Sequence, residues 1–191
     1  MSNGSPQPQN PTWWDHHELT FWLWAALNNA DRYFSSSNAF QAAIADMFNK
    51  DISTRSDVRT NLDDLKKQTT LAGYNFVTAM GVLIRVLERS QYLFPSIQPP
   101  YSRANHLQKE GKQIRNMIEH AYGKDGYLSG GGHHKDKFVR QEAGITADAT
   151  STIIKDGVHW LGNRLCVEKV VDEIRAIHEE ADKIEAPKGD D

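Results

Sequence analysis

Apolar or small residues recur from Asp57 to about Tyr92 at alternating intervals of four and three residues. Intervals that average about 3.5 residues keep these side chains on one face of an α-helix. Because the helical rise is about 1.5 Å per residue, the stretch predicts one helix of roughly 50 Å, which the prolines from Pro95 onward end. An apolar face of this length predicts a helical bundle. Its positions are Val58, Leu62, Leu65, Thr69, Ala72, Phe76, Ala79, Leu83 and Val86.

Four shorter segments have apolar residues at helical spacing. Residues 15–33 begin with Asp15, a candidate N-cap, and carry large apolar residues on more than one face, which indicates a well-buried helix. A short second helix is predicted over 37–48. Another runs from about 102 to 122, and the last covers 166–184. The inward stripe predicted for the helix 102–122 comprises Leu107, Ile114, Met117, Ile118 and Ala121.

The segment before the last helix has a different composition. Residues 146–154 are rich in threonine, alanine and β-branched side chains, and Asp156-Gly157 is a favoured hairpin turn, so a small β-hairpin is predicted over 146–164. The expected fold is mainly α: a four- to five-helix up-down bundle with this hairpin before the last helix. We expect one domain over 13–185, a disordered leader over 1–12 and a polar tail over 186–191.

The cysteine content and the distribution of apolar residues indicate a cellular compartment. Cys166 is the only cysteine, so no intrachain disulfide forms, and a small buried residue is its expected role. The first residues lack the basic and apolar regions of a signal peptide. The most apolar stretch, Phe21 to Leu27, is shorter than the roughly 20 residues that cross a bilayer. These features predict a cytoplasmic protein.

Positive charge is concentrated in residues 103–140. This segment carries eight lysines and arginines against four acids, a charge of +4, whereas the whole chain has a net charge of −3. A locally positive surface attracts a polyanion such as RNA, and a solvated face of mixed charge is the alternative. The candidate substrate-binding residues are Lys112, Lys124, Lys135 and Lys137.

Arg115, Asn116 and His120 form the pattern R-N-x-x-x-H near the predicted end of the helix 102–122. Asn116 and His120 stack on one helical face, and Arg115 lies about 140° from His120 at 100° per residue, so all three meet only at the helix end. The trio suits cleavage of RNA by its own 2′-hydroxyl. His120 would transfer protons, Arg115 would bind the phosphate and Asn116 would orient the imidazole.

Other readings of these residues and of their neighbours remain open. Arg115 and Glu119 are spaced for an ordinary ion pair on a solvated face, with His120 capping the last turn. The His133-His134 pair after three glycines has the residue types of a metal site, but a flexible loop makes ordering costly. No nucleotide-binding glycine motif is present. We therefore expect no metal and no cofactor.

The run from Arg115 to His120, its late position in the bundle and the long preceding helix resemble the HEPN superfamily (higher eukaryotes and prokaryotes nucleotide-binding). The resemblance implies a helical bundle over about 15–185 and, as in many members, a metal-independent ribonuclease that acts as a toxin or in defence. The predicted hairpin and Glu119 depart from the family pattern.

Because one motif supplies only one histidine, we expect a homodimer that brings two Arg115/His120 pairs to one cleft. A non-catalytic helical interaction module, which pairs with itself or with another protein, is the alternative from a different functional class. A toxin held in check by an antitoxin or another regulatory protein, such as a nucleotidyltransferase antitoxin, is implied by the family alone.

Overall fold

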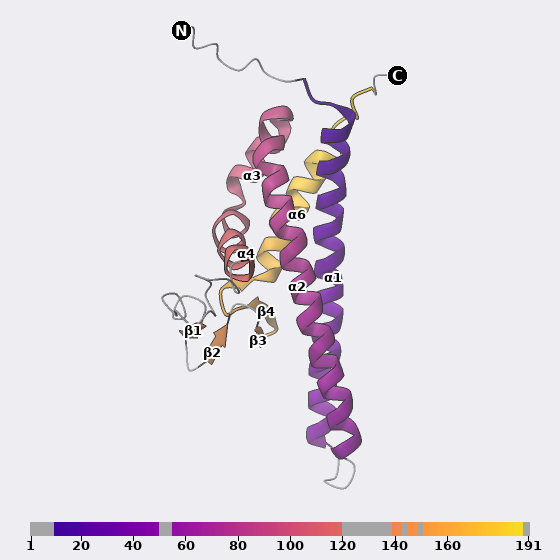
Figure 1. Cartoon of the computed structure of the whole chain (residues 1–191), viewed down its shortest axis with the longest axis vertical. Helices are drawn as coiled ribbons and strands as arrows, with labels where there is room; N and C mark the ends of the chain where they lie inside the picture. Colours follow the sequence, from indigo (N-terminus) through magenta and orange to yellow (C-terminus); the bar gives the residue numbers. More distant parts are fainter. Residues whose placement is uncertain (1–9, 50–54, 120–138, 143–144, 149–150, 189–191) are drawn as a thin grey trace.

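Two long helices, α1 (Trp13–Asn49) and α2 (Arg55–Leu93), lie side by side along the length of the molecule (Figure 1). The shorter helices cover one half of this pair, and the strands lie beside the lower end of α4 (Lys112–Glu119). The protein is therefore mainly helical with a small β region, as the sequence predicts. The structure is a computed structural model that describes residues 10–49, 55–119, 139–142, 145–148 and 151–188.

The helix α1 begins in a reciprocal cap. The Asp15 carboxylate accepts hydrogen bonds from the backbone N–H and the hydroxyl of Thr12, at 2.9 and 2.6 Å, and the Asp15 N–H donates to the Thr12 hydroxyl at 3.2 Å. Thr12 is thus the N-cap, and the prediction of Asp15 in that role was wrong by three residues. The separate helix predicted over 37–48 was also wrong, because α1 continues through it to Asn49.

The helix α2 confirms the predicted long helix. The heptad positions from Thr69 to Val86 are at most 9% exposed, and Leu62 and Leu65 are half-buried. A second buried stripe, which the heptad did not reveal, follows Val77, Met80, Ile84 and Leu87. Because α2 is buried on two faces, it packs against α1 on one side and against the 95–119 segment on the other.

This burial on two faces gives α2 a long apolar stretch. Its residues 61–93 contain an 18-residue window that is apolar enough to cross a membrane, so naming Phe21 to Leu27 as the most apolar stretch was wrong. In that window 56% of the residues are buried inside the fold. The composition therefore follows from core packing on two faces.

The helix predicted over 102–122 is broken into several pieces. A 3-10 turn (Pro95–Ile97) leads into α3 (Gln98–Arg103), whose C-cap is Ala104, and a π-helical turn (Leu107–Gly111) precedes α4. Pro99 and Pro100 occupy the first turn of α3, where a missing N–H costs nothing. The predicted inward residues Leu107, Ile114 and Met117 are buried, whereas the side chain of Ile118 and the whole of Ala121 lie outside the described part of the chain.

The β region is larger than the predicted hairpin. β3 (Thr152–Lys155) and β4 (Val158–Leu161) form that hairpin, and Asp156 and Gly157 have φ angles of 53° and 77° in its turn. A third antiparallel strand, β5 (Leu165–Cys166), extends this sheet. β1 (Val139–Glu142) and β2 (Ile145–Asp148) form a separate antiparallel pair that the sequence did not predict.

The last helix, α6 (Val167–Ala181), buries the predicted apolar stripe and packs mainly against α1. The helix α2 likewise packs mainly against α1. Cys166, at the N-cap of α6, is 3% exposed, which confirms a small buried residue. Burial raises the pKa of its thiol, and the neighbouring Glu168 raises it further, so Cys166 is a weak nucleophile.

Candidate functional site

Arg115 and Asn116 lie together on α4. The Asn116 Oδ1 accepts hydrogen bonds from the Arg115 Nε and Nη2, at 3.0 and 2.6 Å. Asn116 is exposed and Arg115 is half-buried. Because two bonds from one acceptor fix the plane of a guanidinium group, Asn116 orients the face that Arg115 presents.

The stem of Arg115 rests on α2 at Gly81. A Cβ atom at Gly81 would lie 2.7 Å from the Arg115 Cγ and 2.8 Å from its Cδ, closer than real Cβ atoms approach other atoms. Gly81 thereby leaves the space that the arginine stem fills. The sequence carried a signal for this role, because Gly81 interrupts an otherwise apolar stretch of a long helix, but it did not identify Arg115 as the partner.

Lys112, predicted to bind substrate, lies on the same helix three residues before Arg115. Its Nζ pairs with the Glu88 carboxylate of α2, and both side chains are partly exposed. This ion pair joins α4 to α2 next to the arginine. It also offsets part of the positive charge that Lys112 would offer to a phosphate.

A carboxylate of α6 caps the helical residues that precede α4. Glu173 accepts the backbone N–H of His106 at 3.1 Å and that of Leu107 at 2.7 Å. These N–H groups lie at the start of the π-helical turn, where no helical carbonyl serves them. π-Helical turns are frequent at functional sites because they change the direction of the following side chains. Sequence periodicity does not reveal a capping residue 66 positions away.

The other predicted site residues lie outside the described part of the chain. These are His120 and the lysines Lys124, Lys135 and Lys137, and the side chain of Glu119 is not described either. The structure thus brings Arg115, Asn116 and Lys112 together and leaves the position of the histidine as a prediction. Among the described residues, no three histidine, cysteine or acidic side chains gather as metal ligands.

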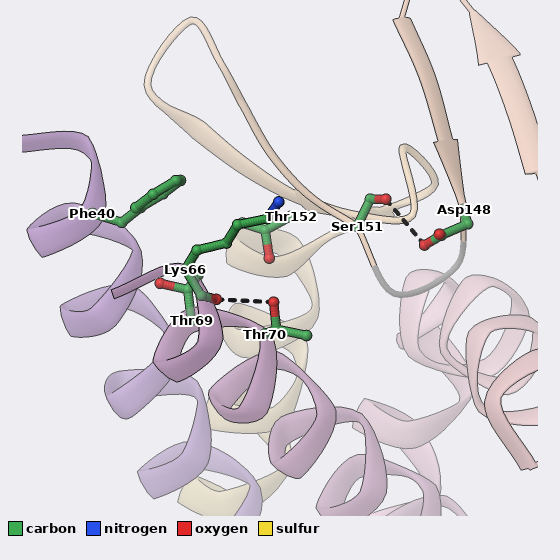
Figure 2. Close-up of a pocket in the computed structure, with 7 residues that line it drawn as sticks. All are labelled: Phe40, Lys66, Thr69, Thr70, Asp148, Ser151 and Thr152. Atoms are coloured by element: carbon green, nitrogen blue, oxygen red, sulfur yellow. Dashed lines mark hydrogen bonds between the residues drawn. The ribbon is translucent and has the colours of Figure 1, made fainter. Parts of the chain in front are cut away.

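A hydroxyl-rich cleft of about 330 Å³ lies elsewhere, between α1, α2 and β3 (Figure 2). The Thr69 and Thr70 hydroxyls already donate to helix carbonyls, and the Ser151 hydroxyl donates to Asp148 at 3.0 Å. The cleft contains none of the predicted site residues. It is lined by Phe40, Lys66, Thr69, Thr70, Asp148, Ser151 and Thr152.

A buried polar cluster lies between α1 and β4. The His159 Nδ1 lies 2.7 Å from the Glu168 carboxylate, and the His159 ring packs edge-on against Tyr33 and Phe34. Burial raises the pKa of Tyr33 above its usual value. A histidine held by a carboxylate has the pairing of a general base, but His159 is 6% exposed and closed to a substrate. We therefore assign this cluster to the packing of the sheet on α1.

The candidate site is thus the Arg115–Asn116 pair of α4, in which the Arg115 stem packs on Gly81 and Glu173 caps the start of the helical segment that leads to it. Comparison of the chain with protein-family models, with curated proteins and with solved structures gave no match, so its function has to be argued from this geometry.

Proposed function

We propose that the chain is a metal-independent endoribonuclease of HEPN type that cleaves RNA through its 2′-hydroxyl. The observation that carries the proposal is the Arg115–Asn116 pair, in which a guanidinium group is held at the surface by two hydrogen bonds. A guanidinium group held in one orientation can donate two hydrogen bonds to the oxygens of a phosphate that gains negative charge during cleavage. The long α1–α2 pair is consistent with an up-down bundle of this family.

In the proposed mechanism His120, four residues after Asn116 in the sequence, transfers the protons. It would take the proton of the 2′-hydroxyl or give one to the leaving 5′-oxygen, because its ordinary pKa lies near neutral pH. The attack of the 2′-oxygen on phosphorus breaks the bond to the 5′-oxygen and leaves a 2′,3′-cyclic phosphate. Lys112, Lys124, Lys135 and Lys137 would attract the RNA backbone.

The test is cleavage of single-stranded RNA by purified protein in EDTA. We expect 2′,3′-cyclic phosphate ends, no cleavage of 2′-deoxy substrates and a loss of about 10²–10⁴-fold in rate for His120→Ala. Arg115→Lys should also lose activity, because lysine lacks the planar fork. Matched controls are His178→Ala and Arg103→Lys, which alter the same residue types elsewhere. Equal rates for wild type and His120→Ala would identify a contaminating nuclease and remove the proposal.

Gly81→Ala tests the packing of the Arg115 stem against α2. The new methyl group would displace the Arg115 stem, so we expect a clear loss of cleavage rate with little change in the thermal midpoint. Its control is Gly157→Ala, at a turn where an added Cβ meets no atom within 4 Å, although its positive φ costs some stability. Normal cleavage by Gly81→Ala would show that the packing of this stem does not matter.

A non-catalytic interaction module is the second candidate function. The observation that favours it is a set of exposed aromatic side chains on α1, among them Trp14 at 71% and Trp24 at 56% exposed. Under either function we propose a cytoplasmic homodimer, and a toxin bound by an antitoxin is the form that the HEPN resemblance suggests. Absence of cleavage across varied RNAs, with an intact dimer, would support the module.

A further inference from the structure

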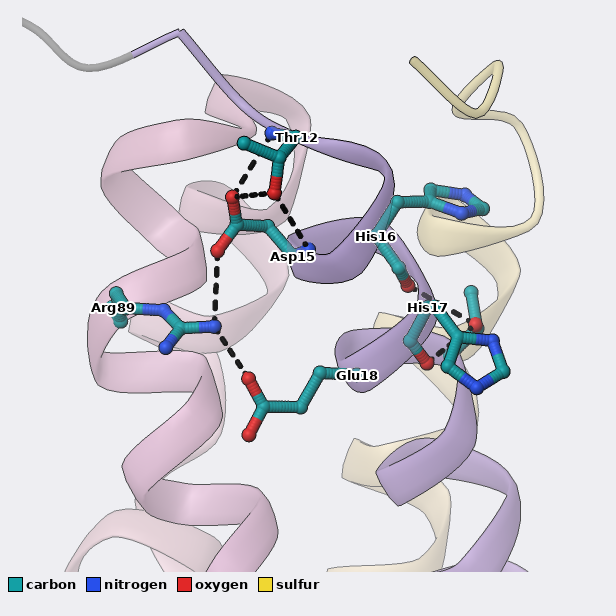
Figure 3. Close-up of polar contacts among 7 residues, drawn as sticks. Thr12, Asp15, His16, His17, Glu18 and Arg89 are labelled. Atoms are coloured by element: carbon teal, nitrogen blue, oxygen red, sulfur yellow. Dashed lines mark hydrogen bonds and ion pairs between the residues drawn. The ribbon is translucent and has the colours of Figure 1, made fainter. Parts of the chain in front are cut away.

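The first three turns of α1 present aromatic rings on the face opposite the core. Trp14, His17, Phe21 and Trp24 follow one another at intervals of three, four and three residues, whereas the buried face carries Leu19, Leu23 and Ala26. Trp14, Phe21 and Trp24 are 71%, 44% and 56% exposed, and the adjacent Trp13 is 40% exposed. Figure 3 shows the His17 ring on the side of α1 away from Arg89 of α2.

These rings contact one another and form one continuous surface. Trp13 stacks on His17 with ring centres 4.8 Å apart, His17 stacks on Phe21 at 6.4 Å, and Phe21 lies 6.0 Å from Trp24. At about 150–250 Å² for each aromatic side chain, the four exposed rings offer roughly 400 Å² of surface. That is about half of the ~800 Å² that each partner buries in a standard protein interface.

The surface is hollowed at its centre. A cleft of about 330 Å³ is lined by Trp14, His17, Glu18 and Phe21. These residues occupy positions i, i+3, i+4 and i+7, the four positions that form the hole for one side chain of a facing helix in knobs-into-holes packing. The cleft thus has the form of a socket for a large apolar side chain on a second helix.

We propose that this aromatic face pairs with the same face of a second copy, with the two α1 helices antiparallel. The intervals three, four and three are symmetric about residue 19, so a twofold axis there places Trp14 level with Trp24 of the partner subunit. The same axis places the partner's Phe21 level with His17, where it enters the cleft. A twofold interface requires such a self-complementary patch.

The charges around the face favour a second copy over a lipid surface. No lysine or arginine occurs from residue 13 to 31, whereas helices that lie on membranes are rich in these residues. The two acids on the rim, Asp15 and Glu18, both pair with Arg89, at 3.1 and 2.5 Å (Figure 3). In the proposed register the two Glu18 side chains lie on the same edge of the interface, one residue either side of the axis, and the pairing of each with Arg89 offsets their mutual repulsion.

This interface differs from a dimer built around the cleavage motif. The aromatic face belongs to α1, and its His17 ring lies on the side of α1 away from Arg89 of α2 (Figure 3), whereas Arg115 rests on Gly81 of α2. Pairing through α1 therefore keeps the two Arg115 side chains out of the interface. The proposal does not depend on ribonuclease activity, and a cleft that unites two Arg115/His120 pairs would require a second interface apart from α1.

Light scattering on the full chain over a range of micromolar concentrations measures the dimer. We expect Trp14→Glu combined with Trp24→Glu to raise the dimer dissociation constant at least ~30-fold, as for central aromatic residues of an interface. The matched control is Phe48→Glu combined with Tyr92→Glu, since Phe48 and Tyr92 are 72% and 81% exposed outside this face. Circular dichroism verifies that each variant is folded. A monomeric wild type, or equal weakening by both pairs, would overturn the proposal.

Disulfide cross-linking tests the orientation and leaves every aromatic ring in place. Thr20→Cys lies one residue from the axis, so two copies should cross-link readily under mild oxidation. Asn28→Cys should not, because an antiparallel pair holds the two positions about 27 Å apart at 1.5 Å per residue. Cys166 is buried and gives little background. Cross-linking through residue 28, or a dimer that Arg115→Glu disrupts and the tryptophan variant does not, would refute the antiparallel α1 interface.

Discussion

The α1–α2 pair and the segment from Pro95 to Glu119 are both helical, but different forces position them. The α1–α2 pair repeats one local pattern, in which apolar residues at heptad spacing meet along two long helices. The 95–119 segment instead changes helix type three times and depends on single distant residues, Glu173 of α6 and Gly81 of α2. Repetition gives the pair its stability, while individual contacts give the candidate site its geometry.

Breaking the repeated pattern should have the largest effect. Leu83 is fully buried in the core, so Leu83→Asp places an unpaired carboxylate there at a cost of several kcal/mol. We expect loss of the cooperative thermal transition at neutral pH. Leu71→Asp on the same helix is the control, because Leu71 is 60% exposed. A folded Leu83→Asp protein of wild-type stability would show that the core of α2 does not hold the fold together.

The contrast between a repeated local pattern and single distant contacts also explains which parts of the fold could be predicted from the sequence. The long helix was predicted within two residues at its N-terminal end, because its periodicity is read from nearby residues. The hairpin turn at Asp156-Gly157 was predicted because its backbone demands are local. The break near Ala104 was missed, because the predicted stripe begins only at Leu107 and marks no boundary before it. The N–H groups that follow the break bind the Glu173 carboxylate of a distant helix.

The candidate site follows the same division. The sequence identified Arg115 and Asn116, whose proximity follows from their adjacency in the chain. The sequence predicted that Lys112 binds substrate, but it did not predict the ion pair of Lys112 with Glu88, because Glu88 belongs to a different helix. The seat of Arg115 at Gly81 was also missed, because a close approach between two helices depends on their relative placement in the fold.

Removing the cap of the irregular segment should have an intermediate effect. Glu173→Ala leaves the N–H groups of His106 and Leu107 without their acceptor, at a cost of about 1–3 kcal/mol. Hydrogen exchange should accelerate in 104–119 more than in α1. Asp172→Ala is the matched control, because its carboxylate lies on the surface, where it contacts Arg175 at 3.5 Å. Equal acceleration in both regions would mean that the segment has no separate stability.

The smallest expected effect concerns the cap of α1, which depends on pH. Burial raises the pKa of Asp15, but the Thr12 hydrogen bonds and the charge of Arg89 lower it more, so the pKa lies below its usual 3.8. A carboxyl group with a lowered folded-state pKa adds stability above its unfolded pKa and loses it as the pH falls through the folded value. Thr12→Ala should therefore cost about 0.5–2 kcal/mol at pH 7.

The difference between wild type and Thr12→Ala should shrink below pH 3.8, once Asp15 is protonated in both proteins. It should not vanish, because the Asp15 N–H still donates to the Thr12 hydroxyl of the wild type at 3.2 Å, and this bond does not titrate. Urea unfolding at several pH values measures the difference, and Thr70→Ala, at an exposed threonine within α2, serves as the pH-independent control. A difference that grows on acidification would contradict the direction of the Asp15 pKa shift.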